Sequence, residues 1–322
     1  MNKLLFLLLV PVLSVAGEVE ITEWQVPWDK TRPRDPYVAP DGLVWFCGQA
    51  GNYLASLDTG SGEFKKYPFE SRTGPHNLIV DDNGIVWYAG NLAAHIGKLD
   101  PETGTIVHYP MPDERAVDPH TLVFGEPGVI WFSVQRGNFV GHIDLDTGEV
   151  KLIEVPTKNA RPYGIIVAPN GSPWFAEFGS NKLGRVDRES MSVVEYELPR
   201  DGARPRRLEA TSDGMIWYVD YADGYLGRLD PQTKEIEEWL LPSGAASRPY
   251  GMVVDDKDRL WFVETGPDPN RFVGFDPDTE KFFHTTAIES GGGAVRHMMY
   301  EAATQTVWFG TDENTIGRAV LP

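Results

Sequence analysis

Residues 74–112 read GPHNLIVDDNGIVWYAGNLAAHIGKLDPETGTIVHYPMP, and this stretch decides the fold. It contains four short apolar or alternating segments, at 75–80, 85–88, 96–99 and 106–111. A turn sequence at 82–84 lies between the first and second segments, and another at 100–104 lies between the third and fourth. Each turn sequence ends in a glycine that tolerates positive φ. Because no apolar period of 3.6 residues is sustained, we predict four antiparallel strands with no helix between them.

The same pattern occurs seven times along the chain. A tryptophan followed by an aromatic residue marks each copy, at Trp45, Trp87, Trp131, Trp174, Trp217, Trp261 and Trp308. Subtraction gives intervals of 42, 44, 43, 43, 44 and 47 residues. Seven copies of a four-stranded unit predict an all-β, seven-bladed β-propeller. We expect the tryptophans to pack between blades, because a buried indole contributes a large apolar area.

The seventh copy is incomplete at its C-terminal end. After Trp308 and the segment 316–318 the sequence reaches Pro322 without a fourth strand. The segment VEITEWQVP at 19–27 has the pattern of a fourth strand and resembles VEYELP at 194–199. We therefore predict that residues 19–27 complete the last blade and close the ring, which removes exposed sheet edges.

The first residues have the pattern of an export signal. Lys3 supplies a positive start, residues 4–15 an apolar run, and Ser14-Val15-Ala16 a cleavage pattern. We predict a signal peptide at 1–16 and one propeller domain at 17–322, secreted or periplasmic. The apolar run is shorter than the ~20 residues that span a bilayer, so no membrane anchor is expected. With Cys47 as the one cysteine, no internal disulfide can form.

The net charge limits the partners that we expect. At −18 it would repel a phosphate backbone, which argues against nucleic acid as a partner. We expect a monomer that binds a small molecule or a peptide, of neutral or cationic character.

Chemistry is expected where the repeat varies. Eleven residues before each tryptophan, at the start of the innermost strand, lie Arg34, His76, His120, Tyr163, Arg206, Tyr250 and His297. Each is polar or ionisable although the strand positions that follow are read as apolar. Seven-fold symmetry would place them in one ring around the mouth of the central channel, where convergent polar groups indicate a ligand site.

A second set lies three or four residues after each tryptophan. Its members are Gln49, Asn91, Gln135, Glu177, Asp220, Glu264 and Asp312. The acids fall in blades four to seven and the amides in blades one to three, so we expect an asymmetric mouth that could orient a cationic group. The alternative is that these side chains solvate the channel and bond the ends of the strands.

The segment Arg161-Pro162-Tyr163-Gly164-Ile165, followed by WFAE at 174–177 and NKLGR at 181–185, resembles the repeat of the virginiamycin B lyase (streptogramin lyase) family. The likeness covers all seven units, from about residue 19 to 322. It implies a seven-bladed propeller that opens a cyclic streptogramin by magnesium-dependent elimination at an ester linkage, without adding water. In the family, an E-P-H-G segment of the last blade supplies a base histidine and a metal-binding acid, and a second acid follows that blade's tryptophan.

Carried over residue by residue, the base histidine matches His297 and the later acid matches Asp312, which would be the metal ligand. The first acid falls at Val295 and the proline of the motif at Arg296. A substrate-contacting histidine of the family is replaced by Tyr250, and an early tyrosine by Arg34.

Two classes of function follow from these observations. One is a lyase-like enzyme with His297 as base and Asp312 as acid or as ligand of Mg²⁺ or another divalent cation; a variant holds a transition metal between His76, His120 and His297. The other is a non-catalytic exported binding or sensor propeller that uses the same ring. A lactonase-like hydrolase is a weaker third reading.

Overall fold

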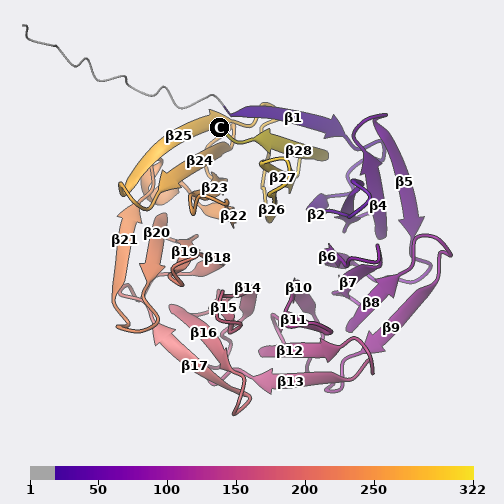
Figure 1. The fold of residues 1–322 in the computed structure, drawn as a ribbon, viewed down its shortest axis with the longest axis horizontal. Coiled ribbons are helices and arrows are strands. Elements are labelled where there is room, and N and C mark those ends of the chain that lie inside the picture. The colour runs from indigo at the N-terminus through magenta and orange to yellow at the C-terminus, as the bar shows by residue number, and fades with distance from the viewer. Residues whose placement is uncertain (1–18) are drawn as a thin grey trace, which may run out of the picture.

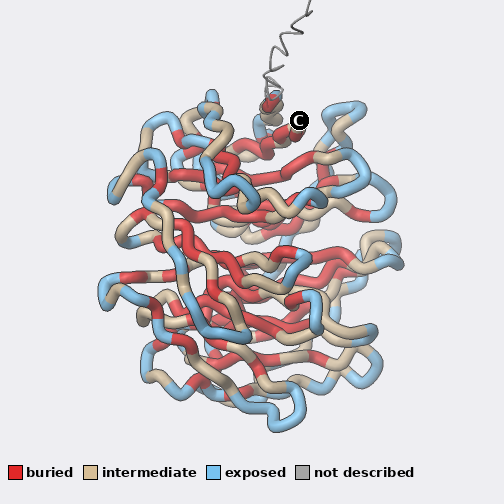
Figure 2. The backbone as a smooth tube through the Cα atoms, turned by 60° about the vertical axis from the view of Figure 1, so that its left-hand side comes forward, coloured by how far each residue is buried: buried red, intermediate tan, exposed pale blue. Residues whose placement is uncertain are grey.

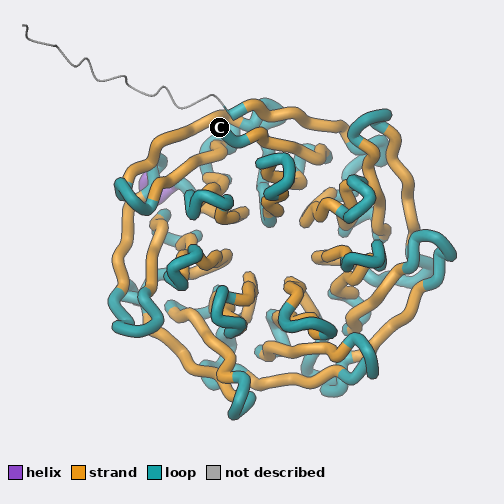
Figure 3. The backbone as a smooth tube through the Cα atoms, in the orientation of Figure 1, coloured by secondary structure: helices purple, strands orange, loops and turns teal. Residues whose placement is uncertain are grey.

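Every blade of the protein is a four-stranded antiparallel sheet, and seven blades surround one axis (Figure 1). The computed structural model describes residues 19–322, so the predicted signal peptide at 1–16 lies outside the described residues. The predicted seven-bladed β-propeller is confirmed. Figure 3 shows strands throughout the ring, and the helical structure in the described chain is the 3₁₀ turn η1 (Gly244–Ala246). No helix in the described range is long and apolar enough to cross a membrane.

The strands fall into four concentric sets. The innermost strands are β2 (Pro33–Val38), β6 (Pro75–Val80), β10 (Pro119–Phe124), β14 (Pro162–Val167), β18 (Pro205–Ala210), β22 (Pro249–Val254) and β26 (Met298–Glu301). The second strands are β3 (Val44–Gly48), β7 (Val86–Gly90), β11 (Val129–Val134), β15 (Pro173–Glu177), β19 (Ile216–Asp220), β23 (Leu260–Glu264) and β27 (Thr306–Gly310). The third strands are β4 (Tyr53–Asp58), β8 (His95–Leu99), β12 (Phe139–Asp144), β16 (Lys182–Asp187), β20 (Tyr225–Leu229), β24 (Arg271–Asp276) and β28 (Thr315–Val320). The outermost strands are β5 (Glu63–Pro68), β9 (Ile106–Pro110), β13 (Val150–Glu154), β17 (Ser192–Glu197), β21 (Ile236–Leu240), β25 (Lys281–Ala287) and β1 (Glu20–Gln25).

The first strand of the chain closes the ring, as predicted. In blade seven β1 pairs with β28, from Glu20 opposite Val320 to Gln25 opposite Thr315. The Trp24 ring stacks on that of Trp308 with the ring centroids 5.7 Å apart. The sheet order β1-β28-β27-β26 therefore completes the blade that the C-terminal segment leaves with three strands.

The apolar core lies between blades. All seven repeat tryptophans are buried, and Trp45 of blade one packs in a cluster with Leu78 and Val86 of blade two. Figure 2 shows buried backbone along the strands and exposed backbone at the turns. Glycines on the third strands make this packing possible, since a Cβ on Gly184 would lie 2.1 Å from the Phe175 ring. At Gly184 the neighbour is the aromatic residue that follows the repeat tryptophan.

Candidate functional site at the channel mouth

Bulges mark the first residues of the innermost strands. In β10 the register passes from the pair Pro119 and Val134 directly to Leu122 and Phe132. Equivalent shifts occur in β2, β6, β14, β18 and β22. Since a bulge changes the direction of side chains on its strand, these shifts bring side chains of different blades together near the axis.

Four of the seven residues predicted for the first ring form a continuous contact series. The ring centroids of His76 and His120 lie 3.8 Å apart, and those of His120 and Tyr163 lie 4.0 Å apart. The hydroxyl groups of Tyr163 and Tyr250 share a short hydrogen bond, although these residues belong to blades four and six. Packing at this level is tight, because all four side chains are buried.

Arg206 continues this series on the side of blades four to six. Its guanidinium carbon lies 3.6 Å from the ring centroid of Tyr250, 4.2 Å from that of Tyr221 and 4.7 Å from that of Phe178. Cation–π attraction holds a guanidinium in such surroundings. Tyr221 and Phe178 follow directly after the second strands, and the sequence analysis did not select them.

A further set of inward positions was missed by the sequence analysis. These residues lie ten before each tryptophan, and are Asp35, Asn77, Thr121, Gly164, Arg207, Gly251 and Met298. The prediction that apolar residues follow the first ring was wrong for four of them, which are polar or charged. We name this set the inner ring.

Hydrogen bonds join the inner ring across blades one to three. Arg34 Nε donates to Asp35 Oδ1 over 3.0 Å, and Arg34 Nη1 donates to Gln49 Oε1 over 3.0 Å. Asn77 Nδ2 donates to Asp35 Oδ2 over 3.0 Å, while Asn77 Oδ1 accepts from the backbone of Leu122 over 2.8 Å. Asp35 adopts a left-handed φ of 51°, which places its carboxylate between these donors.

Arg207 spans the axis from blade five. Its Nε donates to the carbonyl of Arg296 in blade seven over 3.0 Å, and its Nη1 donates to Thr121 Oγ1 in blade three over 3.1 Å. Its Nη2 lies 3.9 Å from Asp35 Oδ2 in blade one. Gly164 leaves room for it, because a Cβ there would lie 3.2 Å from Arg207 Cδ.

The three histidines of the first ring are neutral in this environment. Burial lowers the pKa of His297 to about 3, with Arg207 adding to this effect and Asp35 opposing it. Burial also lowers the pKa of His76 and His120 well below the usual value, and nearby arginines lower both further. Each imidazole can therefore accept a proton only when negative charge develops nearby.

The arginines also affect the acidic groups. Burial alone would raise the pKa of Asp35, but Arg34 above all brings it below its usual value. Burial would likewise raise the pKa of Tyr163, but Arg206, Arg34 and Arg207 together lower it. The arginines thus supply positive charge at the mouth, beside the asymmetric set of acids and amides that the sequence predicted.

Three acids of the second set form bonds to nearby loops. Glu177 Oε2 accepts from Ser180 Oγ over 2.8 Å. Asp220 Oδ1 accepts from the backbone of Arg204 over 2.8 Å, and Glu264 Oε1 accepts from the backbone of Ser243 over 2.9 Å. All three are fully buried, and burial raises the pKa of Glu177 to about 7. These contacts match the alternative in which such residues bond the strand ends.

The amides of the second set have varied surroundings. Gln49 accepts from Arg34, as described, and Asn91 Nδ2 donates to the carbonyl of Pro119 over 3.0 Å. Gln135 is partly buried at the end of its strand.

His297 and Asp312 do not form a hydrogen-bonded pair in the described structure. His297 is half-buried just before β26, and its Nδ1 has no hydrogen-bond partner within residues 19–322. Asp312 instead accepts from both terminal nitrogens of Arg296, with 2.6 Å between Nη2 and Oδ2.

The residues do not fit the divalent site that the resemblance implies. Val295 stands fully buried at the position of the first acid, and the guanidinium of Arg296 occupies both oxygens of Asp312. Across the described residues, no group of three or more His, Cys, Asp or Glu side chains is arranged to hold a metal ion. This also applies to the arrangement of His76, His120 and His297.

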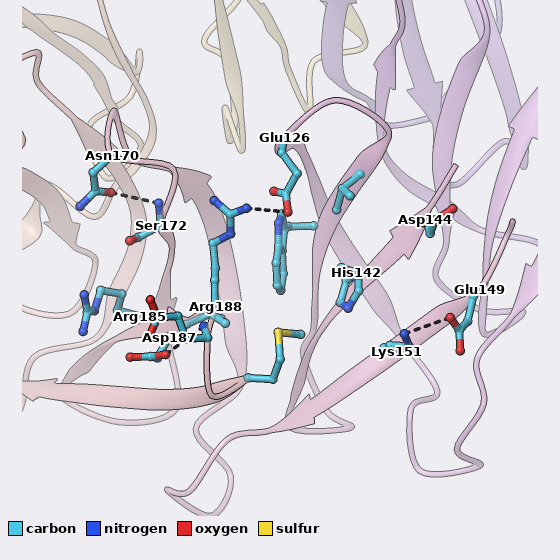
Figure 4. Close-up of a pocket in the computed structure, with 15 residues that line it drawn as sticks. Glu126, His142, Asp144, Glu149, Lys151, Asn170, Ser172, Arg185, Asp187 and Arg188 are labelled. Atoms are coloured by element: carbon cyan, nitrogen blue, oxygen red, sulfur yellow. Dashed lines mark hydrogen bonds and ion pairs between the residues drawn. The ribbon is translucent and has the colours of Figure 1, made fainter. Parts of the chain in front are cut away.

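A separate hollow of about 610 Å³ lies between blades three and four (Figure 4). It is bordered by the turns that follow the inner strands, at the opposite strand ends from the first ring. Arg188 pairs with Glu126 over 2.8 Å and Lys151 with Glu149 over 3.0 Å, while the Trp131 ring lies against that of His142. None of the site residues predicted from the sequence lines this hollow.

Known proteins share both the sequence pattern and the fold of this chain. The sequence matches the virginiamycin B lyase family over residues 11–268. The chain belongs to the virginiamycin B lyase family. No curated protein matches the chain at a significant level.

Solved structures of two lyases superimpose over almost the whole chain. The virginiamycin B lyase from Staphylococcus aureus is 25% identical, with a TM-score of 0.85, covering 95% of this chain and 100% of that one. A streptogramin B lyase is 26% identical, with a TM-score of 0.84, covering 94% and 98%. Hydrazine synthase of Kuenenia stuttgartiensis is 13% identical with a TM-score of 0.77, covering 92% and 97%, and shares the fold alone.

The sequence match to the family ends within blade six. The sequence match ends at residue 268, so His297, Asp312 and the substituted Val295 and Arg296 all lie beyond it. The replacements at Val295 and Arg296 therefore fall on the segment that the resemblance makes catalytic, whereas those at Arg34 and Tyr250 lie within the matched range.

Proposed function

We propose that the protein is an exported enzyme that cleaves a carbon–oxygen bond of a small ester-containing ligand by elimination at the channel mouth. Family membership supports the type of reaction. The observation that carries the proposal is His297, a half-buried neutral imidazole whose Nδ1 is unpaired within the described chain and which lies beside Arg207. We further propose that the enzyme acts as a monomer in the periplasm or outside the cell.

In this reaction His297 would remove the proton on the carbon next to a carbonyl group. The electron pair of that C–H bond forms a carbon–carbon double bond, and the bond from the adjacent carbon to the ester oxygen breaks. The ester oxygen leaves as a carboxylate, so no water is consumed. Negative charge on the carbonyl oxygen and the leaving group would be stabilised by Arg207 and Arg34, which are fixed in a buried setting.

The positive charge in this proposal comes from arginine. Because the residues do not fit a divalent cation, no step is assigned to one. The low pKa of His297 makes it a weak base in the free protein. Negative charge on the reacting ligand would raise that pKa during proton transfer.

A non-catalytic ligand-binding propeller is the second candidate. The ion pair between Arg296 and Asp312 favours it, because the guanidinium occupies the carboxylate that the resemblance makes the metal ligand. In this case the ring would bind a ligand without changing it.

The experiment is incubation of the mature protein with streptogramin B and with simpler cyclic esters in water enriched in oxygen-18, followed by mass spectrometry. Elimination gives a product of unchanged mass without the isotope, whereas a lactonase-like hydrolase adds labelled water. We expect slow elimination that is lost in His297→Ala and retained in His108→Ala, a change on the exposed outermost strand of blade two. Binding without any product would support the second candidate and overturn the first.

A further inference from the structure

The channel interior contains more positive than negative charge. Arg34 and Arg207 are each 3% exposed, and Arg206 is partly buried with its guanidinium carbon 3.6 Å from the ring centroid of Tyr250. Asp35 is the buried carboxylate that faces Arg34 and Arg207. Among these four groups, three guanidinium groups and one carboxylate leave an excess of two positive charges.

Other titratable groups around Arg207 do not restore the balance. His76, His120 and His297 are neutral, as described above. Burial raises the pKa of Glu209 to about 8, which disfavours a negative charge on this neighbour of Arg207. A buried charge without a partner strongly destabilises a folded protein.

All three guanidinium groups have an unused buried donor, which is Nε in Arg206 and Nη2 in the other two. Arg34 Nη2 and Arg207 Nη2 are buried, and neither has a hydrogen-bond partner within the described chain. Both groups share Asp35 as a neighbour, at 3.0 Å from Arg34 and 3.9 Å from Arg207. Tyr163 adjoins both as well, since its ring centroid lies 5.4 Å from the guanidinium carbon of Arg207 and its pKa is lowered by Arg34. The free donors therefore lie in the same part of the channel.

We infer that the channel binds a carboxylate between Arg34 and Arg207, with Arg206 at its outer side. A carboxylate has two oxygens in a plane, which match the donor geometry of guanidinium groups. It would accept from the unused Nη2 atoms and balance part of the excess charge. The ligand class is thus a small carboxylic acid, which differs from the neutral or cationic ligand expected from the net charge. The inference goes beyond the proposed reaction, because it holds whether or not the protein turns over a substrate.

The test is calorimetric titration of sodium acetate into the mature protein, dialysed free of halides and small anions, with sodium chloride as a parallel titration. We expect saturable binding of one acetate, a higher melting temperature and weaker binding of chloride. Arg34→Gln should weaken acetate binding about tenfold or more, equivalent to about 1.4 kcal/mol. The matched control Arg115→Gln, on an exposed arginine paired with Asp113, should leave binding unchanged.

Three results would overturn the inference. The first is no saturable binding of acetate to the native protein, whatever the variants do. The second is binding of chloride in preference to acetate, which would identify a halide site. The third is an ultraviolet absorption band of tyrosinate at pH 7 without acetate binding, which would mean that ionised Tyr163 balances the charge. Loss of turnover is not among these outcomes, so failure of the proposed reaction remains distinguishable.

Discussion

Arg207 of blade five reaches across the propeller axis and places its Nη2 3.9 Å from Oδ2 of Asp35 in blade one. Both side chains are buried, and Asp35 also pairs with Arg34. One carboxylate is therefore the counter-charge to two guanidinium groups that come from opposite sides of the channel. This arrangement couples the stability of the ring to the charge of a single residue.

Replacement of Asp35 by Asn should strongly destabilise the protein. The change leaves Arg34 and Arg207 buried without their carboxylate, and we expect the free energy of unfolding to fall by about 3–5 kcal/mol. Urea denaturation measures it. As a control, Asp312→Asn breaks a partly exposed ion pair with Arg296 and should cost about 1 kcal/mol or less. Equal effects of both changes would show that Asp35 has no special role.

Stability should fall as the pH is lowered from about 6.5 toward about 3. Unfolded histidine titrates near 6.5, whereas the folded pKa of His297 is about 3 and those of His76 and His120 are also lowered. Between these values the unfolded chain binds more protons, so acid favours unfolding. The lowered pKa of Asp35 acts in the same direction, because its stabilising charge is lost only when the folded carboxylate is protonated.

Urea denaturation at a series of pH values checks this dependence. His297→Asn should make the stability less dependent on pH in this range, while His108→Asn on the outermost strand should not. A profile that is flat from pH 6.5 to 4 in the native protein would contradict the prediction.

Removal of residues 19–27 should lower the melting temperature by about 10 °C or more. The deletion takes away β1, its pairing with β28 and the stacking of Trp24 on Trp308. Blade seven would then have three strands and an open edge. A form that begins at residue 19 and keeps β1 is the matched control in differential scanning calorimetry. The prediction is wrong if both forms melt together.

Val295→Glu alone should not create a magnesium site, because Arg296 still occupies the carboxylate of Asp312. The double change Val295→Glu and Arg296→Pro frees that carboxylate and restores the first three residues of the E-P-H-G motif, with Met298 still at the position of its glycine. We expect measurable binding of Mg²⁺ by calorimetry in the double variant and none in either single variant. Binding by the native protein would show that the ion pair opens for the metal.

The sequence predicted the fold well because its signals are local and repeated. Turn residues, short alternating strands and the tryptophan period each define a blade without reference to the rest of the chain. The closing role of residues 19–27 could also be predicted, since an incomplete last unit and an unpaired first strand complement each other.

The site was predicted less well because its geometry depends on the bulges. In a regular strand alternate side chains point away from the axis. Residue 207 was therefore predicted to be one of the apolar strand positions that follow the first ring. The useful signal was present in the sequence, because Asp35, Asn77 and Arg207 are poor residues for an apolar strand. Glu177 and Glu264 were predicted to give the mouth an acidic side. They form hydrogen bonds to nearby loops instead, and a repeat pattern does not reveal such bonds.

The pairing of Glu20 with Val320 joins positions 300 residues apart, whereas the hairpins within the other blades join near neighbours. By the scaling of loop entropy with length, a closure of this span costs about 5 kcal/mol beyond the constant term. Contacts of high sequence separation form slowly, so we expect β1 to dock after the other blades have assembled, and pulsed hydrogen exchange would detect its amides as the last to gain protection. Until that step an incomplete ring would expose the free edge of β28, which makes the folding intermediate, rather than the finished propeller, the form most prone to associate with other chains.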